Sequence, residues 1–293
     1  MSQVVTAALV KELRERTSGG MLECKKALDA SGGDIEAAID AMRTSGQAKA
    51  AKKSGRIAAE GVIVICVSED RKAAFMAEVN CETDFVARDE SFKKFADMLV
   101  KCGLKAGVDN VEKLLALRTD TGKTVAEARE ELVVKIGENI QVRRVVLMQS
   151  ENHIAHYLHG ARIGVLVNLS VDNDELGKDI AMHIVASSPQ FVSDKDVAAA
   201  VIEREKAIYL AQAIESGKPQ AIAEKMVTGR LQKFLGEITL LGQPFVKNPD
   251  ITVETLLKNQ KAEVKSFVRF AVGEGIEKET TDFAAEVAAQ VRK

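Results

Sequence analysis

Histidines are the residues of this chain that could most readily ligate a metal or transfer protons. His153, His156 and His159 recur at every third position, which predicts either one face of a helix or a loop. No acidic or cysteine neighbour completes a ligand set around them, so neutral surface or packing roles are expected. His183 lies within a helical pattern and is predicted to pack there. The sequence therefore predicts neither a metal site nor a cofactor.

The four cysteines could supply a nucleophile, but their context favours a packing role. Cys24, Cys66, Cys81 and Cys102 form no C-x-x-C pair and lie among apolar neighbours, as buried free thiols do. The chain also lacks a glycine-rich phosphate loop, a G-x-S-x-G and an H-E-x-x-H motif. We therefore expect no enzyme. The alternative is an enzyme that uses Cys81 or the three histidines, and its turnover would respond to alkylation or chelation.

Composition restricts the other classes of function. The 293 residues are 46% apolar and 29% charged, which is typical of a globular protein of two or more domains. A net charge of −2, 4% aromatic residues and no Trp argue against direct nucleic-acid binding. A ribosome-associated RNA-binding factor is the alternative, with steep salt dependence as its test. No apolar run approaches the ~20 residues of a membrane helix and no signal peptide is evident, so we expect a cytoplasmic protein.

One short stretch has a large apolar residue where burial is not expected. The segment CETDFVARD (81–89), here called the Phe85 turn, follows a strand-like apolar run and precedes a helical pattern. Thr83 and Asp84 could simply cap the next helix, and Phe85 could fold back onto its own core. Alternatively, the ring is presented to another molecule.

The elements before this turn follow from apolar periodicity. Residues 1–46 predict three short helices, separated by TSGG and SGG, in a small helical domain of the ubiquitin-associated type. Such a domain buries little surface alone, so its exposed face is expected to meet a partner. Residues 47–56 are basic and rich in small side chains, and they are predicted to form a linker.

The remaining residues predict an α+β fold whose core has two related α/β subdomains with antiparallel sheets, one over 57–142 and one over 143–275. Within the second, residues 194–235 predict a projecting antiparallel helical hairpin around SGKP, which is a candidate surface for dimers. Residues 276–293 are expected to form a C-terminal helical module. Strands are expected at 61–67, 72–80, 139–148, 161–170 and 266–272, and helices at 109–117, 123–136 and from residue 90.

An internal repeat bears on the Phe85 turn. DESFKKFADMLV (89–100) aligns without gaps to DELGKDIAMHIV (174–185), and each follows a strand-like run. Only the first copy carries the longer connection CETDFVAR. Since the second copy is expected to fold without this connection, the turn is better explained by function than by folding.

Several long motifs resemble the translation elongation factor Ts family. They are LVKELRERTSGGMLECKKALDASGGDIEAAI, EVNCETDFVARD, KIGENIQVRR, HGARIGVLV and GQPFV, and in order they cover essentially the whole chain. The resemblance implies the fold predicted above. It also implies a guanine-nucleotide exchange factor, not an enzyme, that acts on elongation factor Tu during translation elongation.

The resemblance further implies which residues meet the GTPase. Thr83, Asp84, Phe85 and Val86 match the turn that, in the family, enters the GTPase domain and displaces the elements holding Mg²⁺ and phosphate. Whether Asp84 perturbs the electrostatics of the partner or only orients the turn stays open. Additional partner contacts are implied at Arg14, Met21, Leu22 and His159.

Overall fold

The computed structural model describes residues 4–17, 20–215 and 220–277, and its helices and small sheets confirm the α+β class. No helix in this described part is long and apolar enough to cross a membrane. The predicted C-terminal module lies outside the described residues, apart from its first two positions. The chain divides into two compact units, which are described separately: one draws on residues 1–64, 77–146 and 271–293, the other on 65–76 and 147–270.

Three helices begin the first unit and pack around a small apolar core. Leu13, Cys24 and Leu28 are fully buried at its centre. Asp34 caps the third helix, as its carboxylate accepts a 3.0 Å hydrogen bond from the Ala37 backbone N–H. The third helix continues through most of the predicted linker, while the ubiquitin-associated character of the domain stays a prediction. The helices are α1 (Ala7–Thr17), α2 (Met21–Ala30) and α3 (Ile35–Lys53).

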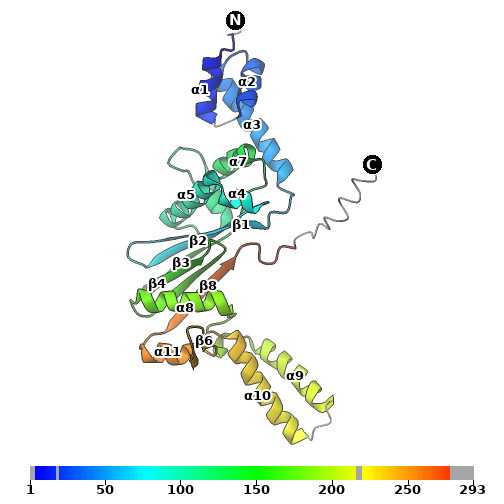
Figure 1. Ribbon diagram of the computed structural model, residues 1–293, viewed down its shortest axis with the longest axis vertical. Helices are drawn as coiled ribbons and strands as arrows, with labels where there is room; N and C mark the ends of the chain where they lie inside the picture. Colours follow the sequence, from blue (N-terminus) through cyan, green and yellow to red (C-terminus); the bar gives the residue numbers. More distant parts are fainter. Residues whose placement is uncertain (1–3, 18–19, 216–219, 278–293) are drawn as a thin grey trace. The chain divides into compact units, whose positions relative to one another are not determined.

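The rest of the first unit contains the elements that hold the Phe85 turn. Phe92 and Leu99 of α5 are fully buried, on the apolar face that the sequence predicts. The three strands form a sheet in the order β1-β2-β3. Figure 1 shows the short helix α4 beyond the end of β2, beside α5. The elements are β1 (Glu60–Val67), β2 (Ala73–Cys81), α4 (Asp84–Arg88), α5 (Glu90–Ala106), α6 (Val111–Ala116), α7 (Val125–Ile136) and β3 (Gln141–Gln149).

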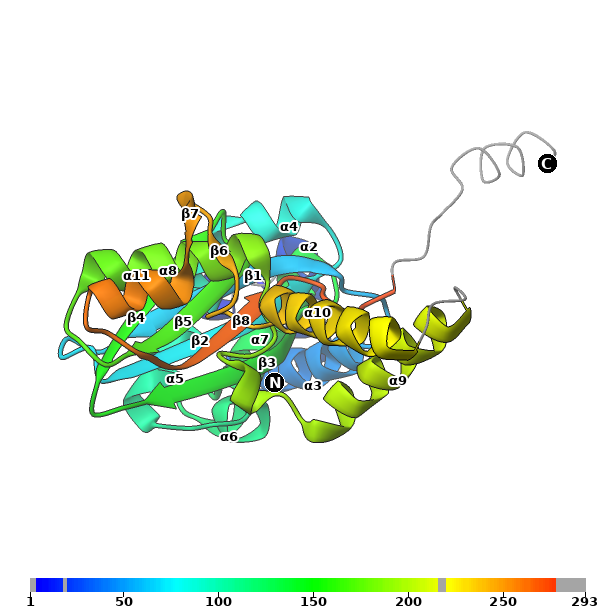
Figure 2. The same ribbon diagram turned by 90° about the horizontal axis from the view of Figure 1, so that it is seen from below.

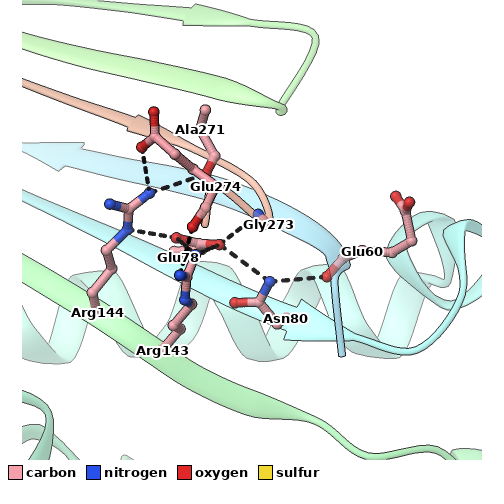
Figure 3. A network of polar contacts seen from close by, with 8 residues as sticks. All are labelled: Glu60, Glu78, Asn80, Arg143, Arg144, Ala271, Gly273 and Glu274. Atoms are coloured by element: carbon pink, nitrogen blue, oxygen red, sulfur yellow. Dashed lines mark hydrogen bonds and ion pairs between the residues drawn. The ribbon is translucent and has the colours of Figure 1, made fainter. Parts of the chain in front are cut away.

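A buried carboxylate fixes the strand that leads into the turn. Glu78 of β2 is fully buried and accepts hydrogen bonds from Arg143 at 3.1 Å, Arg144 at 2.5 Å and the Gly273 backbone N–H at 2.8 Å. The Asn80 amide donates a further hydrogen bond at 3.1 Å. Figure 3 shows these groups converging on Glu78 from β3 and from the segment after β8. A buried charge with this many donors is satisfied, so it can hold β2 and its neighbours in register.

The second unit has its own sheet, in the order β4-β5-β8, with β4 and β5 antiparallel. Three residues, 160–162, connect them; Gly160 and Ala161 have positive φ, and the Arg162 backbone N–H donates a 3.0 Å hydrogen bond to the His159 carbonyl oxygen. Helix α8 packs on β4 and β5 so closely that Gly177 has no room for a side chain against Ala155. The elements are β4 (His153–His159), β5 (Ile163–Leu169), α8 (Asp174–Ser187) and β8 (Val264–Ala271).

Two further helices of this unit pack mainly on each other. Figures 1 and 2 both show α9 and α10 side by side, and Ala213, Ala223 and Val227 form their small shared core. These helices occupy the predicted hairpin region, while its use for dimers stays a prediction. Three elements between residues 244 and 259 were not predicted. The remaining elements are a short 3-10 helix (Asp194–Asp196), α9 (Ala199–Glu215), α10 (Gln220–Ile238), β6 (Pro244–Phe245), β7 (Asn248–Thr252) and α11 (Val253–Asn259).

Candidate functional site: the Phe85 turn

The Phe85 turn contains a short helix that turns one aromatic ring towards solvent. Thr83 is the N-cap of α4, and its hydroxyl accepts a hydrogen bond from the Val86 backbone N–H. Val86 and Ala87 are buried, whereas Phe85 is 78% exposed. The alternative in which Phe85 folds back onto its own core is therefore wrong. Thr83 does act as a cap, but for α4, because Asp89 caps the longer helix α5.

Two glutamates join the start of this turn to the connection between α7 and β3. One Glu138 carboxylate oxygen accepts hydrogen bonds from the backbone N–H groups of Glu82 and Thr83, at 3.1 and 3.0 Å. Its other oxygen accepts a 2.7 Å hydrogen bond from the Thr83 hydroxyl. In the opposite direction, Glu82 accepts a 2.6 Å hydrogen bond from the Asn139 backbone N–H. We call this reciprocal pair of contacts the glutamate clamp.

The clamp residues were not assigned a role from the sequence. Glu138 and Asn139 lie in the quoted motif KIGENIQVRR, 55 or more residues from the turn they hold. The sequence did contain one signal for this connection: a glycine, Gly137, followed directly by two polar residues before a strand. In the structure Gly137 ends α7 with a φ of 91°. That pattern marks a tight connection, but it does not say what the polar side chains contact.

Asp84 and Arg88 form an ion pair along α4. Their side chains are 2.9 Å apart, and both are at least 48% exposed. The acid lies in the first turn and the base in the last, which is the favourable arrangement for the helix dipole. In this structure, therefore, Arg88 partly compensates the charge of the Asp84 carboxylate.

Cys81 lies directly before the turn and is not arranged as a nucleophile. Its thiol is buried and donates a 3.1 Å hydrogen bond to the Thr83 carbonyl oxygen. Burial raises the pKa of Cys81 to about 12, and the negative charges of Glu138 and Glu60 act in the same direction. A buried thiol held protonated in this way is a poor nucleophile.

The other predicted partner contacts are exposed as well. Met21 and Leu22 form the exposed start of α2, with 63% and 75% exposure, and Arg14 is exposed on α1. These residues belong to the first unit, as does the Phe85 turn. His159 is exposed at the end of β4 in the second unit, where the Tyr157 hydroxyl lies 3.4 Å from its Nδ1 atom.

The three evenly spaced histidines do not lie on a helix face or along a loop, as the sequence suggested. They belong to strand β4, where side chains alternate between faces, so His153 and His156 point in opposite directions. The ring of His153 lies 3.0 Å from Asp172 and 3.0 Å from Asp174, acidic neighbours that the sequence pattern did not reveal. Among the described residues no group of three or more candidate ligands could hold a metal ion.

His183 packs as predicted, with both ring nitrogens hydrogen-bonded. Nδ1 accepts a hydrogen bond from the Val246 backbone N–H at 3.2 Å, and Nε2 lies 2.9 Å from the Gln243 side-chain oxygen. Nε2 therefore carries the proton. Burial lowers the pKa of His183 and so favours this neutral form, although the Gln243 hydrogen bond acts in the opposite direction.

Comparison with known proteins identifies the family of the chain. Residues 82–274 match the family model described as elongation factor TS. A protein named elongation factor Ts from Methylococcus capsulatus is 60% identical over 98% of this chain and 99% of its own length. The chain belongs to the elongation factor Ts family.

Other members of the elongation factor Ts family show the same degree of similarity. The proteins of that name from Idiomarina loihiensis and Legionella pneumophila are 56% and 55% identical over 98% of this chain, and over 97% and 99% of their own lengths. Family membership assigns the chain a role in the elongation phase of protein biosynthesis. The matched region begins within the Phe85 turn and includes Glu138.

Proposed function

We propose that this protein is a guanine-nucleotide exchange factor for elongation factor Tu and acts in the cytoplasm. It binds the GDP-bound GTPase and inserts residues 83–86 into the GTPase domain. The insertion disturbs the elements that hold Mg²⁺ and phosphate, and GDP then leaves. The protein itself makes and breaks no covalent bond, so it is not an enzyme in the usual sense.

The observation that carries this proposal is the exposure of Phe85 beside buried neighbours. A ring that is 78% exposed on an ordered turn gains nothing from its position in the free protein. Burying such a side chain is worth roughly 1.5–3 kcal/mol, and this free energy becomes available only when a partner covers the ring. The sequence motif and the geometry therefore support insertion into another protein.

The energetics require more than one contact. An exchange factor and a nucleotide weaken each other's binding to the GTPase by the same factor, because coupling between two ligands is reciprocal. Shifting a population from 1:99 to 99:1 takes about 5.5 kcal/mol of differential affinity, more than one Phe side chain supplies. We assign the remainder to further contacts, proposed at Arg14, Met21, Leu22 and His159.

The proposal gives Asp84 an orienting role. Its carboxylate is already paired with Arg88 at 2.9 Å, so it helps to hold α4 with Phe85 outward. Mg²⁺ is held by the ligands of the GTPase in this mechanism and not by the present chain. Asp84→Asn should therefore slow exchange less than removal of the Phe85 ring does.

Release of a fluorescent GDP from elongation factor Tu, measured with and without this protein, tests the proposed function. Release should accelerate with increasing concentration of the protein and reach a plateau. High Mg²⁺ should oppose the acceleration, because the mechanism acts by weakening the hold on Mg²⁺ and phosphate. Release that is no faster at any concentration would overturn the proposal.

A further inference from the structure

We propose that Glu138 is a positioning residue for nucleotide exchange, because it holds the Phe85 turn in the shape that the partner meets. The inference rests on the proposed function. Glu138 does not itself need to touch the GTPase, since its carboxylate is directed at Glu82 and Thr83 of the same chain.

The chemistry of this contact suits a positioning role. Three donors converge on a single carboxylate: two successive backbone N–H groups and the Thr83 hydroxyl, all at 3.1 Å or less. Hydrogen bonds to an ionised group are among the stronger ones in proteins, and two consecutive N–H groups fix the direction of the backbone. Glu138 thus sets the direction in which the chain enters α4.

A second set of contacts closes the clamp from the other side. Glu82 accepts a hydrogen bond from the Asn139 backbone N–H, and the Asn139 amide donates a 2.7 Å hydrogen bond to the Arg56 carbonyl oxygen. The Arg56 guanidinium in turn lies 3.5 Å from the Glu82 carboxylate. Asn139, which follows Glu138, and Glu82 are therefore each held by further contacts of their own.

The helix α4 is too short to be stable alone and needs contacts such as this clamp. It has five residues, far below the length at which an isolated helix is stable in water. Its largest apolar side chain, Phe85, is 78% exposed, so the packing of α4 within the chain comes mainly from the smaller Val86 and Ala87. A loosened turn would let the ring move or collapse onto nearby surface, and ordering it again would reduce the free energy available for binding.

Mobility of the ring in the free protein is the first test. The chain contains no Trp and two Tyr, so Phe85→Trp introduces a single Trp that can be excited at wavelengths where Tyr does not absorb. In this background Glu138→Ala should increase the nanosecond mobility measured by fluorescence anisotropy decay. Glu138→Gln, which has the same shape and can hydrogen-bond in part, should give an intermediate value. Anisotropy that is unchanged by Glu138→Ala would overturn the proposal.

A double-mutant cycle in the GDP-release assay is the second test. With Phe85 present, Glu138→Ala should lower the plateau rate about tenfold, since a misplaced ring loses part of its burial free energy and about 1.4 kcal/mol corresponds to one decade. With Phe85→Ala, the same change should have an effect of less than about twofold, because the two residues act as one unit. If Glu138→Ala lowers the release rate by the same factor with and without Phe85, its role is generally structural and the assignment is overturned.

A second variant keeps the test valid if Glu138→Ala does not fold. Glu138→Gln keeps the length of the side chain and one acceptor oxygen, and it should also lower the plateau rate, by a smaller factor than Glu138→Ala. Slow release with Phe85→Ala but normal release with Glu138→Ala and Glu138→Gln would refute only the positioning role. Normal release with Phe85→Ala would refute the insertion of the ring and this role together.

Discussion

The guanidinium Nε of Arg144 donates a 2.5 Å hydrogen bond to the carboxylate of Glu78, which is fully buried. Arg144 also reaches the Ala271 carbonyl oxygen at 3.0 Å and the Glu274 carboxylate at 3.2 Å. This one arginine therefore joins β3 to both β2 and the segment after β8. The Phe85 turn continues directly from β2, so the stability of this ionic network underlies the site.

Acid should weaken the fold through Glu78. Burial raises the pKa of this carboxyl, but the Gly273 N–H, Arg144 and Arg143 outweigh burial, so the pKa lies below the ordinary value of 4.5. The unfolded chain then binds the proton more readily than the folded one. The stabilisation is thus complete above pH 4.5 and is lost as the pH falls through the lower, folded-state pKa. Urea denaturation between pH 7 and pH 3 should show this decline.

Glu78→Gln is the control that isolates this carboxyl from others. The variant should be about 3 kcal/mol less stable at pH 7, because it breaks a buried ion pair. The stability difference from the unchanged protein should shrink as the pH falls below 4.5. A difference that stays constant down to pH 3 would contradict the assignment.

The contact between α8 and β4 predicts a destabilising Gly→Ala substitution. A methyl group on Gly177 would lie 2.3 Å from the Ala155 methyl carbon. Overpacking of this kind costs about 1–3 kcal/mol, which exceeds the gain of at most about 1 kcal/mol in helix propensity. Chemical denaturation of Gly177→Ala should therefore show a lower free energy of unfolding.

Two companion variants make that prediction specific. Gly229→Ala lies in α10, where a new methyl group meets nothing within 4 Å, so it should be neutral or stabilising. Ala155→Gly combined with Gly177→Ala should recover most of the loss, since the double variant moves the methyl group to the other side of the contact. Additive losses in the double variant would mean that the contact is not the cause.

Thiol labelling should leave Cys81 untouched in the folded protein. With its pKa raised to about 12 by burial, only a very small fraction is thiolate at pH 8. Iodoacetamide followed by peptide mass spectrometry should detect modification at the partly exposed Cys66 and Cys102 first. Cys81 should react only after denaturation, and GDP release should survive labelling of the native protein. Rapid native labelling of Cys81 would contradict its packing role.

The sequence predicted the long elements well, because their burial patterns are periodic. Phe92, Leu99 and their neighbours repeat at helical spacing, so α5 follows from local information. Helix α4 was missed because five residues carry no period. Its shape depends on Glu138, whose partners lie 55 and 56 residues away in the sequence. A site built from such contacts cannot be assembled from local patterns alone.

Strand β4 was missed for a different reason. Its first three residues are all buried, so it lacks the alternation of a half-exposed strand. His153 is accommodated there because Asp172 and Asp174 lie 3.0 Å from its two nitrogens. Pairing between β4 and β5 through the Gly160–Ala161 turn makes this segment a strand. The equal spacing of the three histidines suggested a helix face or a loop instead.

The rate of GDP release from elongation factor Tu with Phe85→Ala tests the central claim most directly. Stopped-flow release should slow by one to two decades, because loss of roughly 1.5–3 kcal/mol of burial corresponds to about 1.4 kcal/mol per decade. Ile214→Ala, an exposed apolar residue of α9, serves as the matched control and should release GDP at the unchanged rate. A folded Phe85→Ala protein that binds elongation factor Tu and releases GDP as fast as the unchanged chain would contradict the account.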